Sequence, residues 1–151
     1  MHELNPRKAE RSDLDRIKEL EQSSNLAPWT LADYEIALES EFYLLLVAEN
    51  EDVVNGFLLA RIIPESSTPG LIEIMNIAVD KRMRRNGIGS SLVMACIESS
   101  TMSTGTVELE MRESNTVART LYEKLGFTVQ GRRSGYYSNP EEAAILMTLH
   151  F

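Results

Sequence analysis

The order of strand and helix patterns in this sequence predicts a mixed α/β (α+β) domain with strands arranged around two central helices. Apolar, branched runs typical of strands recur along the chain, helical patterns interrupt them, and the order of the two kinds of element is mixed. The chain has 151 residues, 43% of them hydrophobic, which suits one compact core and is short for two. We therefore expect a single domain spanning residues 1–151.

The first half of the chain predicts a strand, two helices and a strand hairpin. Ser12 with Asp15, and Thr30 with Asp33, have the spacing of a capping box and mark two helix starts. The polar residues 50–52 separate two apolar runs as a hairpin turn would. The expected elements are a strand at Glu3–Ala9, a helix from Ser12, a loop at Gln22–Trp29, a helix from Thr30 to about Glu39, and strands at Phe42–Glu49 and Val53–Ile63.

The second half predicts further strands and the two central helices. In the strand Leu71–Val79, alternation places Ile72, Ile74, Asn76 and Ala78 on one face. The other expected elements are an apolar helix ending near Ser100, a strand at Thr106–Met111, a helix at Asn115–Leu125 closed by Gly126, and strands at Phe127–Arg132 and Ala144–Leu149.

The charge balance argues against a nucleic-acid partner. The formal net charge is −8, whereas proteins that bind nucleic acids generally need a basic surface. An acidic balance suits a cationic substrate, although it is also a common route to solubility.

Composition also indicates a cytoplasmic protein without a membrane span or a metal site. The longest apolar run, Phe42–Ala48, is too short to span a membrane, and the first residues lack the basic and apolar stretches of a secretory signal. The single cysteine, Cys96, excludes an internal disulfide and lies in an apolar helical pattern, so we expect it to fill the core. The two histidines, His2 and His150, lie at opposite ends, which argues against a zinc site.

A basic turn with two glycines, residues 79–90, is the most informative segment. A strand enters it, an apolar helix leaves it, and between them lie four cations with Gly87 and Gly89 one residue apart. Free N–H groups at a helix start attract anions, glycine lets a phosphate approach the backbone, and arginine adds charge-assisted bonds. By itself the segment is equally consistent with a tight turn in a solvated loop. It is neither a Walker A loop nor the dinucleotide fingerprint, because the Lys-Ser/Thr pair and the third glycine are missing.

The hexapeptide Arg84–Gly89 resembles the R/Q-x-x-G-x-G/A signature of the GCN5-related N-acetyltransferases, the GNAT superfamily. The resemblance implies that family's acyl-CoA N-acyltransferase fold, a central splayed mixed sheet flanked by helices. It implies that acetyl-CoA enters between the strands Leu71–Val79 and Thr106–Met111, with its pyrophosphate on the turn and its pantetheine arm along the first strand. The residues it assigns to acetyl-CoA are Ile77, Ala78, Val79, Arg84, Arg85, Asn86, Gly87, Ile88, Gly89, Ser90 and Asn115.

Two polar residues downstream are candidates for the chemistry. Strict alternation in residues 107–111 places Glu108 and Glu110 on one strand face, and this pattern on its own is more typical of a solvent-facing acidic edge. Tyr122 lies in a helical pattern where a core aromatic would also fit. The block from Leu109 to Phe127, however, resembles the L-E-V-R-x-S-N…A…L-Y-x-x-L-G-F block of the bacterial ribosomal-protein-alanine acetyltransferases, the RimI type. That likeness makes Glu110 the general base and Tyr122 the acid that protonates the coenzyme-A thiolate, without a metal or an acetyl-enzyme.

Two further segments resemble the acceptor side of the same family. Pro28-Trp29-Thr30 matches its P-W-S/T motif, and Tyr136-Tyr137 with Pro140 matches its Y-Y-x-x-P ending. The likeness implies that Trp29, Tyr136 and Tyr137 contact the acceptor, an N-terminal alanine of a small-subunit ribosomal protein. One departure is Ala143, where the family usually has an acidic residue that Glu141 or Glu142 would have to replace. Other protein N-termini, a lysine, a small amine, or a sensor that binds acetyl-CoA without turnover remain alternatives.

Overall fold

The computed structural model describes residues 5–24, 28–66 and 69–151, and its architecture confirms the mixed α/β class. One sheet of seven strands has the order β1-β2-β3-β4-β5-β7-β6. The strands are β1 (Asn5–Lys8), β2 (Tyr43–Asn50), β3 (Val53–Ile63), β4 (Gly70–Val79), β5 (Gly105–Arg112), β6 (Thr128–Tyr137) and β7 (Glu142–His150). The helices are α1 (Leu14–Ser23), α2 (Leu31–Glu39), α3 (Ile88–Ser99) and α4 (Thr116–Leu125), with short 3-10 turns at Arg11–Asp13 and Lys81–Met83.

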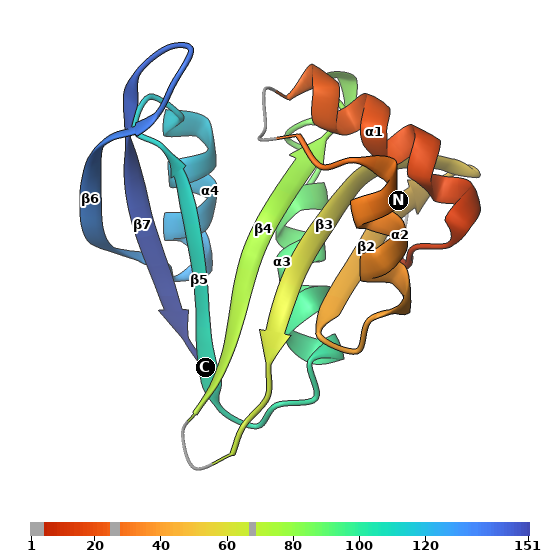
Figure 1. Cartoon of the computed structure of the whole chain (residues 1–151), viewed down its shortest axis with the longest axis horizontal. Coiled ribbons are helices and arrows are strands. Elements are labelled where there is room, and N and C mark those ends of the chain that lie inside the picture. The colour runs from red at the N-terminus through yellow and green to blue at the C-terminus, as the bar shows by residue number, and fades with distance from the viewer. Residues whose placement is uncertain (1–4, 25–27, 67–68) are drawn as a thin grey trace.

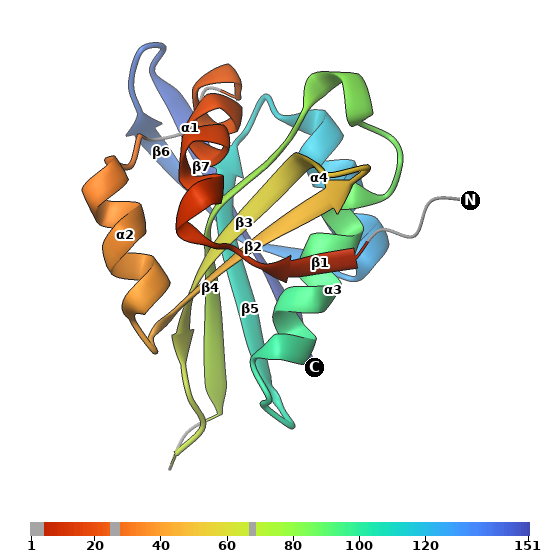
Figure 2. The same ribbon diagram turned by 90° about the vertical axis from the view of Figure 1, so that its right-hand side faces the viewer.

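Helices cover both faces of the sheet and divide the core in two. Figures 1 and 2 show α1 and α2 on one face and α3 and α4 on the other. The α1/α2 core contains Ile17, Tyr34 and Phe57, and the α3/α4 core contains Leu92, Val107 and Tyr122 among many others. Cys96 belongs to the α3/α4 core with 1% of its surface exposed, as expected, and burial raises the pKa of its thiol to about 12.

Several local signals are confirmed. Thr30 Oγ1 accepts from the Asp33 N–H (3.1 Å) while Asp33 accepts from the Thr30 N–H (2.9 Å), so the capping box begins α2. Glu51 and Asp52 have φ of 51° and 63° between β2 and β3, as a tight hairpin turn requires. Gly126 closes α4 with φ 103°, a conformation that favours glycine.

The expected helix start at Ser12 is wrong. The carboxylate that begins this segment is Asp13, which accepts from the Glu10 N–H at 2.8 Å and from both terminal nitrogens of Arg7 at 2.8 and 3.1 Å. Asp13 thus closes a capping box with Glu10 around a 3-10 turn while Arg7 of β1 holds its carboxylate, and α1 starts only at Leu14. The expected first strand also began at Glu3, which lies outside the described residues.

The strands β4 and β5 diverge halfway along their length. They pair in parallel only from Gly70–Gly105 to Ile74–Leu109. Beyond Ile74, β4 pairs within the described chain with β3 alone, whereas β5 continues beside β7. Figure 1 shows the two strands together at one end and apart at the other.

A bulge marks the same point, and it overturns the expected alternation in β4. The β3 register passes from Asn76 to Ile74, which leaves Met75 as an extra residue. Ile72 and Ile74 consequently face the α3/α4 core, whereas Ala78 faces the α1/α2 core. An extra residue moves every following side chain to the other face, so the four residues do not share one face.

The last two strands are longer than expected. β6 runs to Tyr137, five residues past the expected end at Arg132, which places Tyr136 and Tyr137 on a strand.

Within the described residues, no helix is long and apolar enough to cross a membrane.

Candidate active site

The basic turn lies between the free end of β4 and the start of α3. Arg84, Arg85, Asn86 and Gly87 are exposed there. The Asn86 amide donates to the Met83 carbonyl (2.9 Å), which closes the turn. Arg82 is paired with Asp80 (3.3 Å), but no carboxylate of the described chain pairs with Arg84 or Arg85. The two arginines thus keep their charge available for an anion.

The start of α3 offers backbone N–H groups to the same place. Its N-cap, Gly87, has φ 77° and makes no side-chain cap. The first backbone bond of the helix joins the Ser91 N–H to the Gly87 carbonyl (3.0 Å), so the N–H groups of residues 88–90 have no acceptor in the helix. Uncapped amides at the positive end of a helix dipole suit a phosphate.

Gly89 also lies at a close contact between two helices. A Cβ there would lie 2.9 Å from Leu121 Cδ2, so the missing side chain lets α3 pack closely against α4. The turn and α4 are therefore positioned together.

The edge of β4 beyond Ile74 faces the gap. Ile77, Ala78 and Val79 pair with Leu58, Phe57 and Gly56 of β3, so one backbone edge is bonded. Their other edge has no strand beside it in the described structure, because β5 has diverged. An extended arm bearing amides could bond to it as an added strand would.

Glu110 lies on the opposite side of β5 from the α3/α4 core. Val107, Leu109 and Met111 are buried in that core, so Glu108 and Glu110 share the other face, as expected. Glu110 keeps 26% of its side chain exposed, and Arg133 Nη1 lies 3.4 Å from its Oε1. The nearby Glu110 carboxylate raises the pKa of the Tyr136 hydroxyl.

Tyr122 approaches from the other face of the sheet. Its ring is 5% exposed and packs on Phe127, with 5.5 Å between ring centroids. Burial raises the pKa of its hydroxyl, so the phenol stays protonated at neutral pH. Among the described residues, none forms a hydrogen bond that would occupy this hydroxyl. The structure therefore has a carboxylate and a protonated phenol on opposite faces of the sheet.

Asn115 caps α4. Its Oδ1 accepts from the Ala118 N–H (3.2 Å), which accounts for one end of the side-chain amide. Its exposed Nδ2 is the part left for a ligand.

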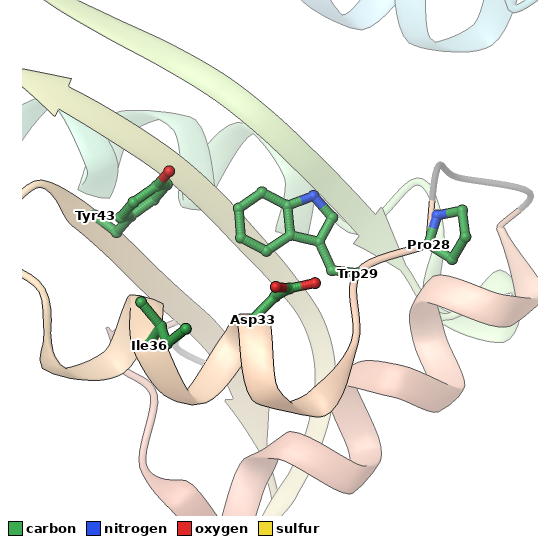
Figure 3. A pocket seen from close by; sticks show the side chains of 5 residues that line it. All are labelled: Pro28, Trp29, Asp33, Ile36 and Tyr43. Atoms are coloured by element: carbon green, nitrogen blue, oxygen red, sulfur yellow. The ribbon is translucent and has the colours of Figure 1, made fainter.

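The expected acceptor residues form two groups. Trp29 packs against Tyr34 and Tyr43, with centroid distances of 5.7 and 5.9 Å. It lines a cavity of about 310 Å³ on the α2 side of the sheet, shown in Figure 3 with Pro28, Asp33, Ile36 and Tyr43.

The second group is the tyrosine pair on β6. The rings of Tyr136 and Tyr137 are perpendicular with centroids 5.0 Å apart, and the Arg112 guanidinium lies 4.7 Å from the Tyr137 ring centre. Burial raises the pKa of Tyr137 to about 12. The structure brings Tyr136 to Glu110, but no contact joins Trp29 to this pair in the described residues.

Glu142, one of the two carboxylates expected to replace the acidic residue missing at Ala143, is already engaged. Ala143 is 5% exposed, and neighbouring Glu142 accepts from the Ser114 N–H and from Arg112 Nη1 (3.1 Å). These bonds hold the pKa of Glu142 below its usual range, and the bond from Ser114 has the largest effect. Glu141 is exposed and lies over Gly135, where an added Cβ would meet its Oε1 at 3.1 Å.

Two polar residues at the site were not expected from the sequence. Arg133 pairs with Glu110, and Glu21 lies 1% exposed beneath the Trp29 segment. Glu21 follows Ile17 by four residues, so its place on the buried stripe of α1 was a signal that could have found it. Nothing comparable in the sequence singled out Arg133. No group of three or more metal-ligating side chains occurs in the described part of the chain.

Comparison with known proteins relates this geometry to one family. The profile of the Acetyltransferase (GNAT) family matches residues 14–127. The ribosomal protein bS18-alanine N-acetyltransferase of Salmonella typhimurium is 33% identical over 141 residues, 91% of this chain and 91% of that protein. The Haemophilus ducreyi enzyme of the same name is 30% identical over 142 residues, 91% of this chain and 94% of that protein.

Solved structures agree. The ribosomal-protein-S18-alanine N-acetyltransferase from Escherichia coli superposes with a TM-score of 0.82 at 28% identity, covering 99% of this chain and 94% of that one. Arabidopsis thaliana NAA60 in complex with acetyl-CoA has a TM-score of 0.85 at 18% identity, covering 99% of each chain, and so supports the fold.

Proposed function

Since the chain belongs to the GNAT family of acetyltransferases, we propose that it acetylates the α-amino group of an N-terminal alanine on a small-subunit ribosomal protein. The chain is an acetyl-CoA-dependent N-acetyltransferase. The gap between β4 and β5 carries the site proposal, because β4 leaves β5 there and the helix that follows β4 begins with uncapped amides. The acceptor itself is proposed from the names of the relatives. Such an acceptor would place the reaction in the cytoplasm, where ribosomes are made.

Acetyl-CoA fits the turn and the strand edge on chemical grounds. The N–H groups of residues 88–90, with Arg84 and Arg85, would hold its diphosphate. The backbone of Ile77, Ala78 and Val79 would bond the pantetheine amides, and Asn115 Nδ2 would add a polar contact. This binding mode would bring the thioester into the gap, where we propose that Glu110 and Tyr122 act on it.

The chain's own groups would then move two protons. Glu110 takes a proton from the acceptor amine, directly or through a water, as the nitrogen attacks the thioester carbonyl. The carbon–sulfur bond breaks as the amide forms, and Tyr122 gives its proton to the departing thiolate. The raised pKa of Tyr122 suits this donor role, because the hydroxyl holds its proton throughout the neutral range.

An α-amino acceptor is supported by acid–base chemistry. A peptide N-terminus has a pKa of about 8, against about 10.4 for lysine, so at pH 7.5 roughly a quarter of N-termini but only about one lysine in a thousand is neutral. Glu110 faces the same side of the sheet as Trp29 and keeps 26% of its side chain exposed, so a chain end could reach it from that side. The acidic net charge of −8 suits a basic ribosomal partner.

A panel of acceptors tests the proposal. Purified protein would be incubated with acetyl-CoA and one acceptor at a time. The acceptors are basic peptides that begin with alanine, the same peptides with a blocked N-terminus and an internal lysine, and a polyamine. We expect one acetyl group on the alanine nitrogen, located by mass spectrometry, and none on the blocked peptides. Preference for the lysine or the polyamine would replace the acceptor, and coenzyme-A binding without any transfer would point to a sensor.

A further inference from the structure

A buried carboxylate, Glu21 on α1, has no part in the reaction described above. It is 1% exposed and accepts hydrogen bonds from three donors. Lys18 Nζ donates to Oε1 (2.6 Å), the Trp29 backbone N–H donates to Oε2 (3.2 Å), and the Tyr34 hydroxyl donates to the same Oε2. A buried charge is costly unless it is paired in this way, so the arrangement has to hold several groups in place at once.

The same ion pair binds both polar groups of the Trp29 backbone. Glu21 accepts the Trp29 N–H, and Lys18 Nζ donates to the Trp29 carbonyl. Both partners come from α1, so the backbone of the segment that enters α2 forms its hydrogen bonds with a helix instead of with water. The indole, held from behind, then lines the cavity in Figure 3, where Trp29, Ile36 and Tyr43 face one another.

The network continues to the strand that borders the gap. Asn76 Nδ2 donates to the Tyr34 hydroxyl (3.3 Å). Asn76 directly follows the bulged Met75, where β4 leaves β5, and directly precedes the Ile77–Val79 edge. A chain of hydrogen bonds therefore runs from the Trp29 backbone through Glu21 and Tyr34 to β4.

We propose that Glu21 is a positioning residue for the acceptor: with Lys18 and Tyr34 it fixes Trp29 relative to β4 and thereby shapes the acceptor-binding side of the active site. This role rests on the proposed function, because it takes Trp29 as an acceptor contact. Glu21 does not touch the reacting atoms. Its loss should affect acceptor binding far more than acetyl-CoA binding, since the coenzyme's turn and strand edge are held by β3 and α3.

Glu21→Gln is the primary test. Glutamine has the same shape, but its NH₂ group cannot accept from Lys18 or from the Trp29 N–H, so one of these donors loses its partner. We expect the KM for an alanine-led peptide to rise about tenfold or more, with the KM for acetyl-CoA within about twofold of wild type. The matched control is Glu19→Gln on the same helix, because Glu19 is 67% exposed and pairs only with Arg16 in the described structure.

Trp29 is the only tryptophan in the chain, so its fluorescence reports whether Glu21 and Lys18 hold the Trp29 backbone in place, and this readout does not require enzyme activity. Glu21→Gln should shift the emission to longer wavelength and increase quenching by acrylamide, and Glu19→Gln should change neither. If the variant does not fold, Tyr34→Phe serves instead, because it keeps the ring and removes only the hydroxyl that joins Glu21 to Asn76.

The outcomes separate this inference from the proposed function. Unchanged acceptor KM and unchanged quenching in a folded Glu21→Gln protein, or equal losses for peptide and acetyl-CoA, would overturn the positioning role. A wild-type protein that acetylates no N-terminus would overturn the proposed function, while the quenching comparison would still decide whether Glu21 fixes Trp29.

Discussion

The Arg133 guanidinium on β6 lies 3.4 Å from the Glu110 carboxylate on β5, so the proposed base already has a cation beside it. Arg133 is 60% exposed and its guanidinium carbon lies 5.8 Å from the centre of the Tyr136 ring. An ion pair this exposed is weak, so an incoming α-ammonium group can take the place of the guanidinium. Once the ammonium group has lost its extra proton to solvent, the neutral amine would lie beside the carboxylate that takes a second proton from it during the attack.

Glu110→Gln tests the base. The amide cannot take a proton, so we expect kcat to fall by about a hundredfold or more, while the KM for acetyl-CoA stays within about twofold. The dependence of rate on pH should also flatten, as measured by steady-state kinetics from pH 6 to 9. Glu108→Gln, on the same face of β5, is the control and should retain most of the activity. A change in KM alone would show that Glu110 is not the base.

Tyr122→Phe tests the acid. The variant keeps the ring packed on Phe127 and removes only the hydroxyl, so kcat should fall about tenfold to a hundredfold with little change in thermal stability. Burial raises the pKa of Tyr122, which extends its protonated form to higher pH. At pH values up to about 10, the wild-type rate should therefore show no decrease caused by deprotonation of Tyr122. Full activity in Tyr122→Phe would remove the residue from the mechanism.

Gly87→Val tests the phosphate turn. Gly87 has φ 77°, where a branched side chain costs about 1–2 kcal/mol, and its Cβ would stand at the uncapped amides. Coenzyme-A affinity, measured by calorimetry, should fall at least about tenfold. Gly131→Val on β6 is the control, because an added Cβ there meets nothing within 4 Å. Wild-type affinity in a folded Gly87→Val protein would contradict the assignment.

Asp13→Asn tests the pairing of β1 with the start of α1. Hydrogen bonds from Arg7, and further from the Glu10 N–H, hold the pKa of Asp13 below its usual range. A lowered pKa means that the stabilisation is fully present above the unfolded pKa of about 3.9 and is lost as the pH falls below it. At pH 7 the variant should lose about 1–3 kcal/mol of unfolding free energy.

Urea denaturation at several pH values measures this effect. The difference between Asp13→Asn and wild type should be constant near neutral pH and should shrink as the pH falls below about 3.9 and the wild-type carboxylate takes up a proton. Asp15→Asn is the control, since Asp15 is exposed on the first turn of α1. A difference independent of pH would mean that the charge of Asp13 is not what stabilises this region.

Local signals predicted most of the fold. The Thr30–Asp33 cap and the Gly126 stop depend on residues within one turn of each other, and the structure contains both. Features that depend on distant partners were missed. The start of α1 depends on Arg7 from β1, and the facing of β4 changes at Met75 because β3 pairs around an extra residue.

The candidate site shows the same division. The alternation that placed Glu110 opposite the core is a property of β5 alone and is confirmed. Arg133 reaches Glu110 only because β7 lies between β5 and β6 and brings the two strands into one sheet. The hydrogen bonds around Glu21 join α1, α2 and β4, and the spacing of residues along the chain does not predict this arrangement.

A crystal structure of the protein with coenzyme A would test the central claim most directly. We expect the diphosphate against the amides of residues 88–90, the pantetheine arm along Ile77–Val79, and the sulfur in the gap between Glu110 and Tyr122. Coenzyme A bound on another face, or a diphosphate remote from Gly87, would contradict it.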